Sequence, residues 1–144
     1  MPQAFTDIAH VIQLAIAPVF MLTAIGTVIN VLAGRLGRAV DRRRVLVAAL
    51  PKLDADLAGI AQAEIAFEIR RIHLIYLAIS GSVTSALFVC LLIALAFVDA
   101  FVDMDFAKLV AVLFILAMVA LIASLTIFLR EIFISINSPR APVV

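Results

Sequence analysis

Residues 8–34 read IAHVIQLAIAPVFMLTAIGTVINVLAG, and this stretch decides the fold because it contains no Asp, Glu, Lys or Arg. A helix of these 27 residues rises about 1.5 Å per residue and is longer than the hydrocarbon layer of a bilayer, which is about 30 Å thick. We therefore expect residues 8–34 to form the first membrane span of the protein.

The same span carries polar and small side chains that repeat every seven residues along two neighbouring lines. One line holds Gln13, Phe20, Thr27, Gly34 and Asp41, and the other holds Ile16, Thr23, Asn30, Gly37 and Arg44. Hydrocarbon does not stabilise polar groups, so we expect this face to meet other helices or water instead of lipid. The candidate helix-packing or pore-lining residues are Gln13, Thr23, Thr27, Asn30, Gly34 and Gly37.

The composition of the whole chain also indicates a membrane protein. Of its 144 residues, 66% are hydrophobic, whereas soluble domains are about 45–50% apolar. The formal net charge is only +1, which gives no reason to expect a nucleic-acid partner. Cys90 is the single cysteine, so no disulfide can form within the chain.

Two further charge-free runs and one charged segment complete the pattern. Residues 74–98 and 109–129 are long and apolar enough to form a second and a third span. Residues 35–71 are charged, and apolar residues recur there at steps of three and four on both sides of Pro51, which predicts a helical hairpin. We therefore expect an all-α polytopic membrane protein with three transmembrane helices, forming one membrane domain over residues 1–144.

The distribution of lysine and arginine predicts the orientation of the chain. Eight of these residues lie between spans one and two, whereas the turn at residues 99–108 has only Lys108 beside three aspartates. Loops rich in lysine and arginine stay in the cytoplasm. We therefore expect the N-terminus outside the cell, and the charged hairpin and the C-terminus in the cytoplasm.

Two segments of the chain resemble a known family. IQLAIAPVFMLTAIGTVINVLAGRLGRAVDR at residues 12–42 and LIASLTIFLREI at residues 121–132 are similar to the small, mostly bacterial membrane proteins known as domain of unknown function 2721. The resemblance covers nearly the whole chain and implies the same three-span arrangement, in the inner membrane of a bacterium. It brings no activity, substrate or catalytic residue with it.

Arginines at the end of the first span form a second candidate site. Arg35, Arg38 and Arg42 share one helix face because they are spaced by three and four residues. Such a face attracts anionic lipid headgroups, or it forms ion pairs with acidic side chains of the returning helix. Asp41 and Arg44 lie in the seven-residue pattern itself, where an ion pair between helices is also open. The acidic candidates on the returning helix are Glu64, Glu68, Asp54 and Asp56.

The sequence contains no arrangement of residues that indicates enzyme chemistry. It has no Ser/His/acid or Cys/His motif and no glycine-rich phosphate loop. No predicted span contains Asp, Glu, Lys or Arg, which proton pumps and ion-coupled carriers usually require. We expect a protein without enzyme activity, cofactor or bound metal.

Three spans are few to cover a polar face, so we expect the chain to self-associate into a homo-oligomer. Two functions fit this expectation. In a channel for ions or small solutes, the first span of each copy would line the path. In a membrane scaffold, the same face would pack against other membrane helices, and the hairpin at residues 35–71 would dock an unidentified membrane or cytoplasmic protein.

Overall fold

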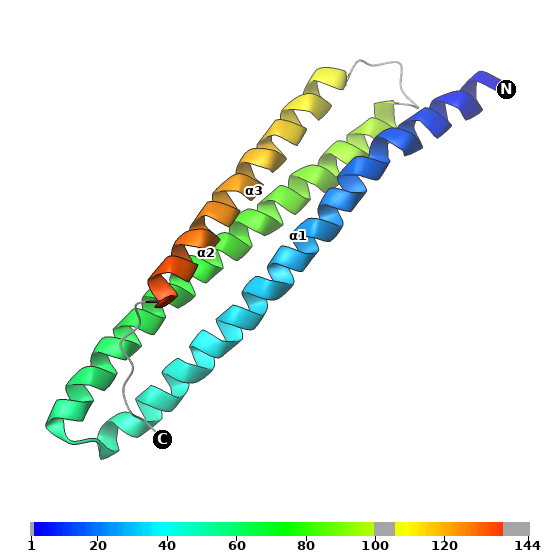
Figure 1. Cartoon of the computed structure of the whole chain (residues 1–144). Helices are drawn as coiled ribbons and strands as arrows, with labels where there is room; N and C mark the ends of the chain where they lie inside the picture. Colours follow the sequence, from blue (N-terminus) through cyan, green and yellow to red (C-terminus); the bar gives the residue numbers. More distant parts are fainter. Residues whose placement is uncertain (1, 100–105, 137–144) are drawn as a thin grey trace. The chain divides into compact units, whose positions relative to one another are not determined.

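A computed structural model of the chain describes residues 2–99 and 106–136, without the side chains of residues 2–11, 14 and 15. Most of the predicted acidic turn, including Asp103 and Asp105, lies outside the described residues, as does the C-terminal segment 137–144. The described part contains only helices. They are α1 (Pro2–Ala49), the short 3₁₀ helix η1 (Leu50–Lys52), α2 (Ala55–Asp99) and α3 (Ala107–Ile136), drawn in Figure 1.

The three α-helices are long and apolar enough to cross a membrane, as the sequence predicts. α1 has 48 residues, α2 has 45 and α3 has 30. At about 1.5 Å per residue, α1 and α2 are each about twice as long as the ~30 Å hydrocarbon layer is thick. Because both helices continue without a break through residues 35–49 and 55–73, the charged segment is an extension of the first two spans.

The turn between α1 and α2 is built around a proline. Pro51 lies in the first turn of η1, where its missing N–H needs no partner. Leu53 then takes an extended conformation with φ −94° and ψ 145°, and its N–H bonds to the carbonyl of Leu50 at 3.4 Å. The carbonyl of Asp54 accepts a 2.8 Å bond from the N–H of Ala58 in the first turn of α2. The chain therefore reverses within a few residues.

The chain divides into two compact units, and each contains a piece of all three long helices. The first unit comprises residues 1–29 and 81–123, and the second comprises residues 30–80 and 124–144. Each unit has its own packed interior, so the two are described separately below.

The interior of the first unit is apolar. Ile25 of α1, Val89 and Leu92 of α2, and Ala117 of α3 are buried together. Ser85 is also fully buried, and its hydroxyl donates a 2.7 Å hydrogen bond to the carbonyl oxygen of Ala117. A small side chain with a satisfied hydroxyl lets two helices approach closely in an apolar setting. α2 and α3 are therefore held together here by both packing and a hydrogen bond.

The second unit contains the helical hairpin. Leu46 of α1 and Ala61 of α2 are fully buried against each other, with Leu50, Leu53 and Ile65 packed around them. Contacts between a late residue of α1 and an early residue of α2 show that the two arms run antiparallel. On the other side of α2, the buried hydroxyl of Ser124 in α3 donates a 2.6 Å bond to the carbonyl of Ala78.

Candidate functional site

The buried residues of α1 follow one line along the helix. Pro18 and Ile25 are buried in the first unit, and Leu32, Ala39 and Leu46 are buried in the second. These five positions are spaced by seven residues, which is the repeat of a helix that packs along one seam with a left-handed twist. α1 therefore turns the same face toward its own chain in both units.

The predicted polar face of α1 lies on the opposite side of the helix. Its residues are two and five positions after each buried residue, which places them about 205° and 155° around the helix at 3.5 residues per turn. Every one of these candidate side chains is exposed. We call this set the outward seam; it consists of Gln13, Thr23, Thr27, Asn30, Gly34 and Gly37.

The two threonines of the outward seam are satisfied by their own helix. The Thr23 hydroxyl donates to the carbonyl of Val19 at 3.3 Å, and the Thr27 hydroxyl donates to the carbonyl of Thr23 at 3.1 Å. Asn30 differs, because its exposed amide has no hydrogen-bond partner among the residues that the structure describes. An amide has two donors and an acceptor to satisfy. The polar demand of this face therefore falls mainly on Asn30.

The glycines of α1 are not needed for packing within the chain. A β-carbon added to Gly26 or Gly37 would meet nothing within 4 Å, and one added to Gly34 would meet only the Arg38 side chain at 3.9 Å. None of the described glycines has a positive φ. Glycine inside a helix costs about 1 kcal/mol relative to alanine. The use of these glycines must therefore lie outside the contacts made by a single chain.

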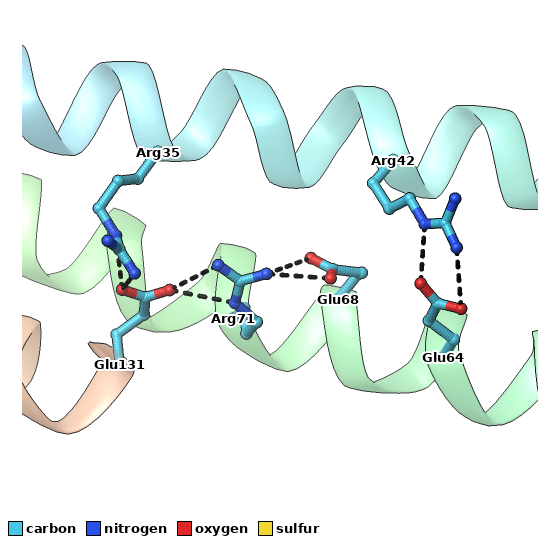
Figure 2. Close-up of polar contacts among 6 residues, drawn as sticks. All are labelled: Arg35, Arg42, Glu64, Glu68, Arg71 and Glu131. Atoms are coloured by element: carbon cyan, nitrogen blue, oxygen red, sulfur yellow. Dashed lines mark hydrogen bonds and ion pairs between the residues drawn. The ribbon is translucent and has the colours of Figure 1, made fainter. Parts of the chain in front are cut away.

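A cluster of four charged side chains joins all three long helices in the second unit (Figure 2). Glu131 of α3 is fully buried, and one of its carboxylate oxygens accepts a 2.9 Å bond from Nε of Arg35 in α1. Its other oxygen accepts two 3.0 Å bonds from Arg71 in α2. Arg71 also donates to both oxygens of Glu68, at 3.0 and 3.1 Å. We call these residues the Glu131 cluster.

The Glu131 cluster is electrically balanced and shielded from solvent. Its two carboxylates, Glu68 and Glu131, are 3% and 0% exposed, and the Arg35 guanidinium is also held 5.6 Å from the ring centre of Phe128. A buried carboxylate is stable only when paired and hydrogen-bonded. Two arginines from different helices meet that requirement, so the cluster fixes α1, α2 and α3 at one level.

A second ion pair joins the arms of the hairpin. Arg42 of α1 donates through Nε and Nη2 to the two oxygens of Glu64 in α2, at 2.7 and 3.2 Å. This two-bond geometry is the strongest form of an arginine–carboxylate contact. Glu64 is 2% exposed. The pair therefore sets the register of α1 against α2 close to the turn.

The structure separates the predicted charged residues into two groups. Arg35, Arg42, Glu64 and Glu68 are brought into ion pairs. The other candidates are exposed and form no ion pair within the described part of the chain; they are Arg38, Asp41, Arg44, Asp54 and Asp56. Sequence reasoning named Glu64 as a possible partner of these arginines but did not single out Arg71 or Glu131.

A sequence signal for the two missed residues existed. Arg35, Arg71 and Glu131 each lie within three residues of the end of a charge-free run. Three spans that end at one membrane surface bring their terminal residues to the same level. A lone acid at the end of one run, facing arginines at the ends of two others, could therefore have been recognised as a cluster.

The described residues show no arrangement typical of an active site. Within them no three His, Cys, Asp or Glu side chains are close enough together to hold a metal ion. His73 and Cys90 are both exposed, and neither is part of the Glu131 cluster. The chemistry that this part of the chain supports is electrostatic: neutralising buried charge and presenting polar groups at a helix surface.

Comparison with known proteins places the chain in a family. The family described as "Protein of unknown function (DUF2721)" matches residues 15–141, which is most of the chain. This match confirms the resemblance seen in residues 12–42 and 121–132. No curated protein and no solved structure matches the chain.

Proposed function

The chain belongs to the DUF2721 family, whose description assigns no activity, and we propose from its own residues that it is an integral membrane protein that self-assembles through the outward seam of α1. One observation carries this proposal. The polar and small residues of the first span lie opposite the line that packs inside the chain. Within a bilayer, a single copy would expose these groups to hydrocarbon.

A polar amide in hydrocarbon is stabilised only by a partner or by water. Asn30 lies five residues before Arg35, so it is about 7.5 Å along the helix from the Glu131 cluster and inside the charge-free run. An amide in an apolar medium without a hydrogen bond costs several kcal/mol. Because the described part of the chain offers Asn30 no partner, the partner comes from outside.

A second copy of the chain fits this requirement. Copies inserted in one membrane have the same orientation, so a symmetric contact along α1 is parallel and places Asn30 beside Asn30. Two amides can each donate to and accept from the other. A single asparagine in such a seam is known to specify register and oligomer state. The alternating spacing of three and four residues along the outward seam is that of a left-handed helix pair.

The glycines and the charges of the outward face support the same partner. Gly34 and Gly37 allow the backbones of two helices to approach closely, as small residues do in membrane helix dimers. Asp41 and Arg44 continue the two lines beyond the first span and carry opposite charges. In a parallel assembly, Asp41 of one copy faces the level of Arg44 of the next, about one turn away.

The number of copies decides between assembly alone and conduction. In a dimer or trimer, the outward seams close against one another and leave no path. In a ring of four or more copies, Gln13, Thr23, Thr27 and Asn30 would line a central axis and replace part of the hydration of a passing ion or solute. Conduction through such a ring is the second function that the exposed polar face favours.

A scaffold function would use the hairpin instead. The tip of the hairpin carries Lys52, Asp54 and Asp56, all exposed and free of ion pairs within the described residues. An unidentified protein could dock there through complementary charges. On this alternative the outward seam would pack against the helices of another membrane protein, so purified chains would remain monomeric.

The orientation follows from the charge distribution. Arginines are concentrated in the second unit, which contains the hairpin, and we infer that this unit lies on the cytoplasmic side of a bacterial inner membrane. Cysteines introduced at exposed positions test this directly, once the native Cys90 is replaced by serine. Ala63, an exposed residue of the hairpin, is a suitable position. The Ala63→Cys variant should react with a membrane-impermeant maleimide only after the cells are opened.

The test of self-assembly is the subunit count of the purified chain in lipid nanodiscs, measured by native mass spectrometry. The wild type and Asn30→Leu are compared. We expect a defined oligomer for the wild type and a lower subunit count for Asn30→Leu at equal concentration. Removing one interhelical amide contact costs about 1 kcal/mol per copy, or about fivefold in dissociation constant.

The matched control is Thr126→Leu. Thr126 is an exposed polar residue of α3 within the third span, so its replacement adds similar apolar surface away from the outward seam. This variant should keep the wild-type subunit count. A monomeric wild type in nanodiscs would overturn self-assembly and favour the scaffold. A ring of four or more copies would call for ion-flux measurements in liposomes.

A further inference from the structure

The second unit separates its charges into an inner, neutral set and an outer, basic set. The inner set consists of three buried carboxylates, each paired with an arginine: Glu64 with Arg42, and Glu68 and Glu131 with Arg71 and Arg35 (Figure 2). The balanced inner set leaves the remaining arginines of the unit as surplus positive charge. A net charge of +1 for the chain conceals this separation.

Three of the surplus arginines lie at the level of the Glu131 cluster, one on each long helix. Arg70 and Arg130 are the neighbours of Arg71 and Glu131 in sequence, and Arg38 follows Arg35 by one helical turn. All three are exposed and form no ion pair with any described residue. We call Arg38, Arg70 and Arg130 the arginine collar.

No carboxylate of the described second unit is placed to neutralise the arginine collar. Its exposed acids are Asp41, Asp54 and Asp56. The last two lie at the hairpin tip, 14 or more residues before Arg70, which is about 20 Å or more along α2. Asp41 is one turn beyond Arg38 and forms no ion pair with it. The collar therefore presents unbalanced positive charge on all three helices.

The collar also lies where apolar helix surface begins. Tyr76, six residues after Arg70, is 56% exposed, and Leu129, next to Arg130, is 52% exposed. From these positions the charge-free runs of the second and third spans continue. Aromatic and basic residues together at the end of an apolar run are typical of the interface between hydrocarbon and headgroups.

We propose that the arginine collar binds the headgroups of acidic phospholipids. A guanidinium donates two parallel hydrogen bonds to a phosphate, which gives geometric fit as well as charge complementarity. The adjoining exposed apolar surface accommodates the acyl chains, so the ligand is a membrane lipid and not a soluble anion. The inner carboxylates make this possible because they occupy Arg35, Arg42 and Arg71 and leave the collar free of acids.

The proposal is tested by native mass spectrometry of the purified full-length chain in detergent, titrated with phosphatidylglycerol or phosphatidylcholine. A basic residue at a membrane surface favours an acidic lipid by about fivefold. We therefore expect the wild type to prefer phosphatidylglycerol, and the variant R38Q/R70Q/R130Q to lose between about tenfold and a hundredfold of this preference.

The matched control is R43Q/K52Q/K108Q. It removes the same number of exposed basic side chains, none of them in the collar. It should keep the wild-type preference. Equal losses in both triple variants, or an unchanged preference in R38Q/R70Q/R130Q, would overturn the proposal. Circular dichroism of both variants checks that the helices remain, which we expect because no collar residue is in an ion pair with a described residue.

Two further measurements use the wild type alone. Inorganic phosphate at the concentration of the lipid should not displace phosphatidylglycerol; full displacement would assign the collar to a free anion. Raising ammonium acetate from about 0.1 M to about 1 M shortens the Debye length from about 10 Å to about 3 Å and should weaken the preference. The same spectra give the subunit count, so failure of self-assembly and failure of lipid binding are read independently.

Discussion

α1 carries two polar regions that differ in where their partners lie. Arg35 and Arg42 reach carboxylates of their own chain, whereas the amide of Asn30 has no partner among the described residues. A buried ion left unpaired costs far more than an unpaired amide. The difference teaches that this chain satisfies its charges internally and leaves its weaker, uncharged polar groups for contacts between chains.

The two regions also differ in what a substitution should change. A change in the Glu131 cluster alters the stability of a single chain, because its partners are on three helices of that chain. A change in the outward seam alters the assembly of chains and leaves the single chain intact. The following predictions test this division, from the largest expected effect to the smallest.

Glu131→Gln should have the largest effect. It removes the negative charge that balances Arg35 and Arg71 at a position that is fully buried. Breaking a buried pair in this way typically costs about 3–5 kcal/mol. We expect that loss in the free energy of unfolding, measured by titration with sodium dodecyl sulfate in mixed micelles.

The control for this change is Asp41→Asn, which removes an exposed carboxylate of α1. It should change the free energy of unfolding by less than about 0.5 kcal/mol. Equal stability of Glu131→Gln and the wild type would show that the cluster does not hold the three helices together.

Arg42→Gln should have the second largest effect. It leaves Glu64, which is 2% exposed, without the guanidinium that binds both of its oxygens. Because Arg42 itself is about one-third exposed, solvent reaches the site and reduces the cost to about 1–3 kcal/mol. Arg43→Gln, at the exposed neighbour, should leave the unfolding curve unchanged; similar losses in both variants would contradict a specific pair.

Gly37→Leu should separate the two regions most clearly. A side chain at this position meets open space in the single chain, and leucine is a better helix former than glycine by nearly 1 kcal/mol. The single chain should therefore be as stable as the wild type or slightly more so. The larger side chain prevents close approach of a second α1, so cross-linking in liposomes should yield fewer oligomers. Undiminished cross-linking would exclude Gly37 from the contact.

Ser124→Ala should have the smallest effect. It removes one hydrogen bond, from the buried hydroxyl to the carbonyl of Ala78, while leaving the close packing of α2 and α3 nearly unchanged. Hydrogen bonds between membrane helices average about 0.6 kcal/mol. The unfolding titration should show a loss of this size, and a loss above about 2 kcal/mol would mean that the hydroxyl has a further role.

Several features of the fold were predictable because they depend on composition along the chain. The charge-free runs at 8–34, 74–98 and 109–129 indicate three membrane-crossing helices, and each lies within a helix of the structure. The reversal at Pro51 follows from the loss of an N–H and a fixed φ. The unbroken passage of α1 from the first span into the hairpin was less evident, because the start of the charged segment does not interrupt the helix.

The candidate site was only partly predictable. The seven-residue spacing of Gln13, Thr27 and Asn30 is visible in sequence, but that spacing is equally compatible with a face packed inside the chain. The choice depends on which side of α1 its own α2 and α3 cover, and burial of Ile25 and Leu32 decides it. Likewise, Glu131 is separated from Arg35 by 96 positions, and no local pattern joins them.

The sequence by itself determined that three helices are long and apolar enough to cross a membrane, because transfer from water to hydrocarbon depends on the side chains of each run alone. The tertiary structure alone decided which arginines are neutralised inside the chain and which remain on its surface. It also decided that the polar face of α1 points away from its own chain. Both outcomes depend on how the helices are rotated and aligned against one another, which is a property of their packing and not of any single segment.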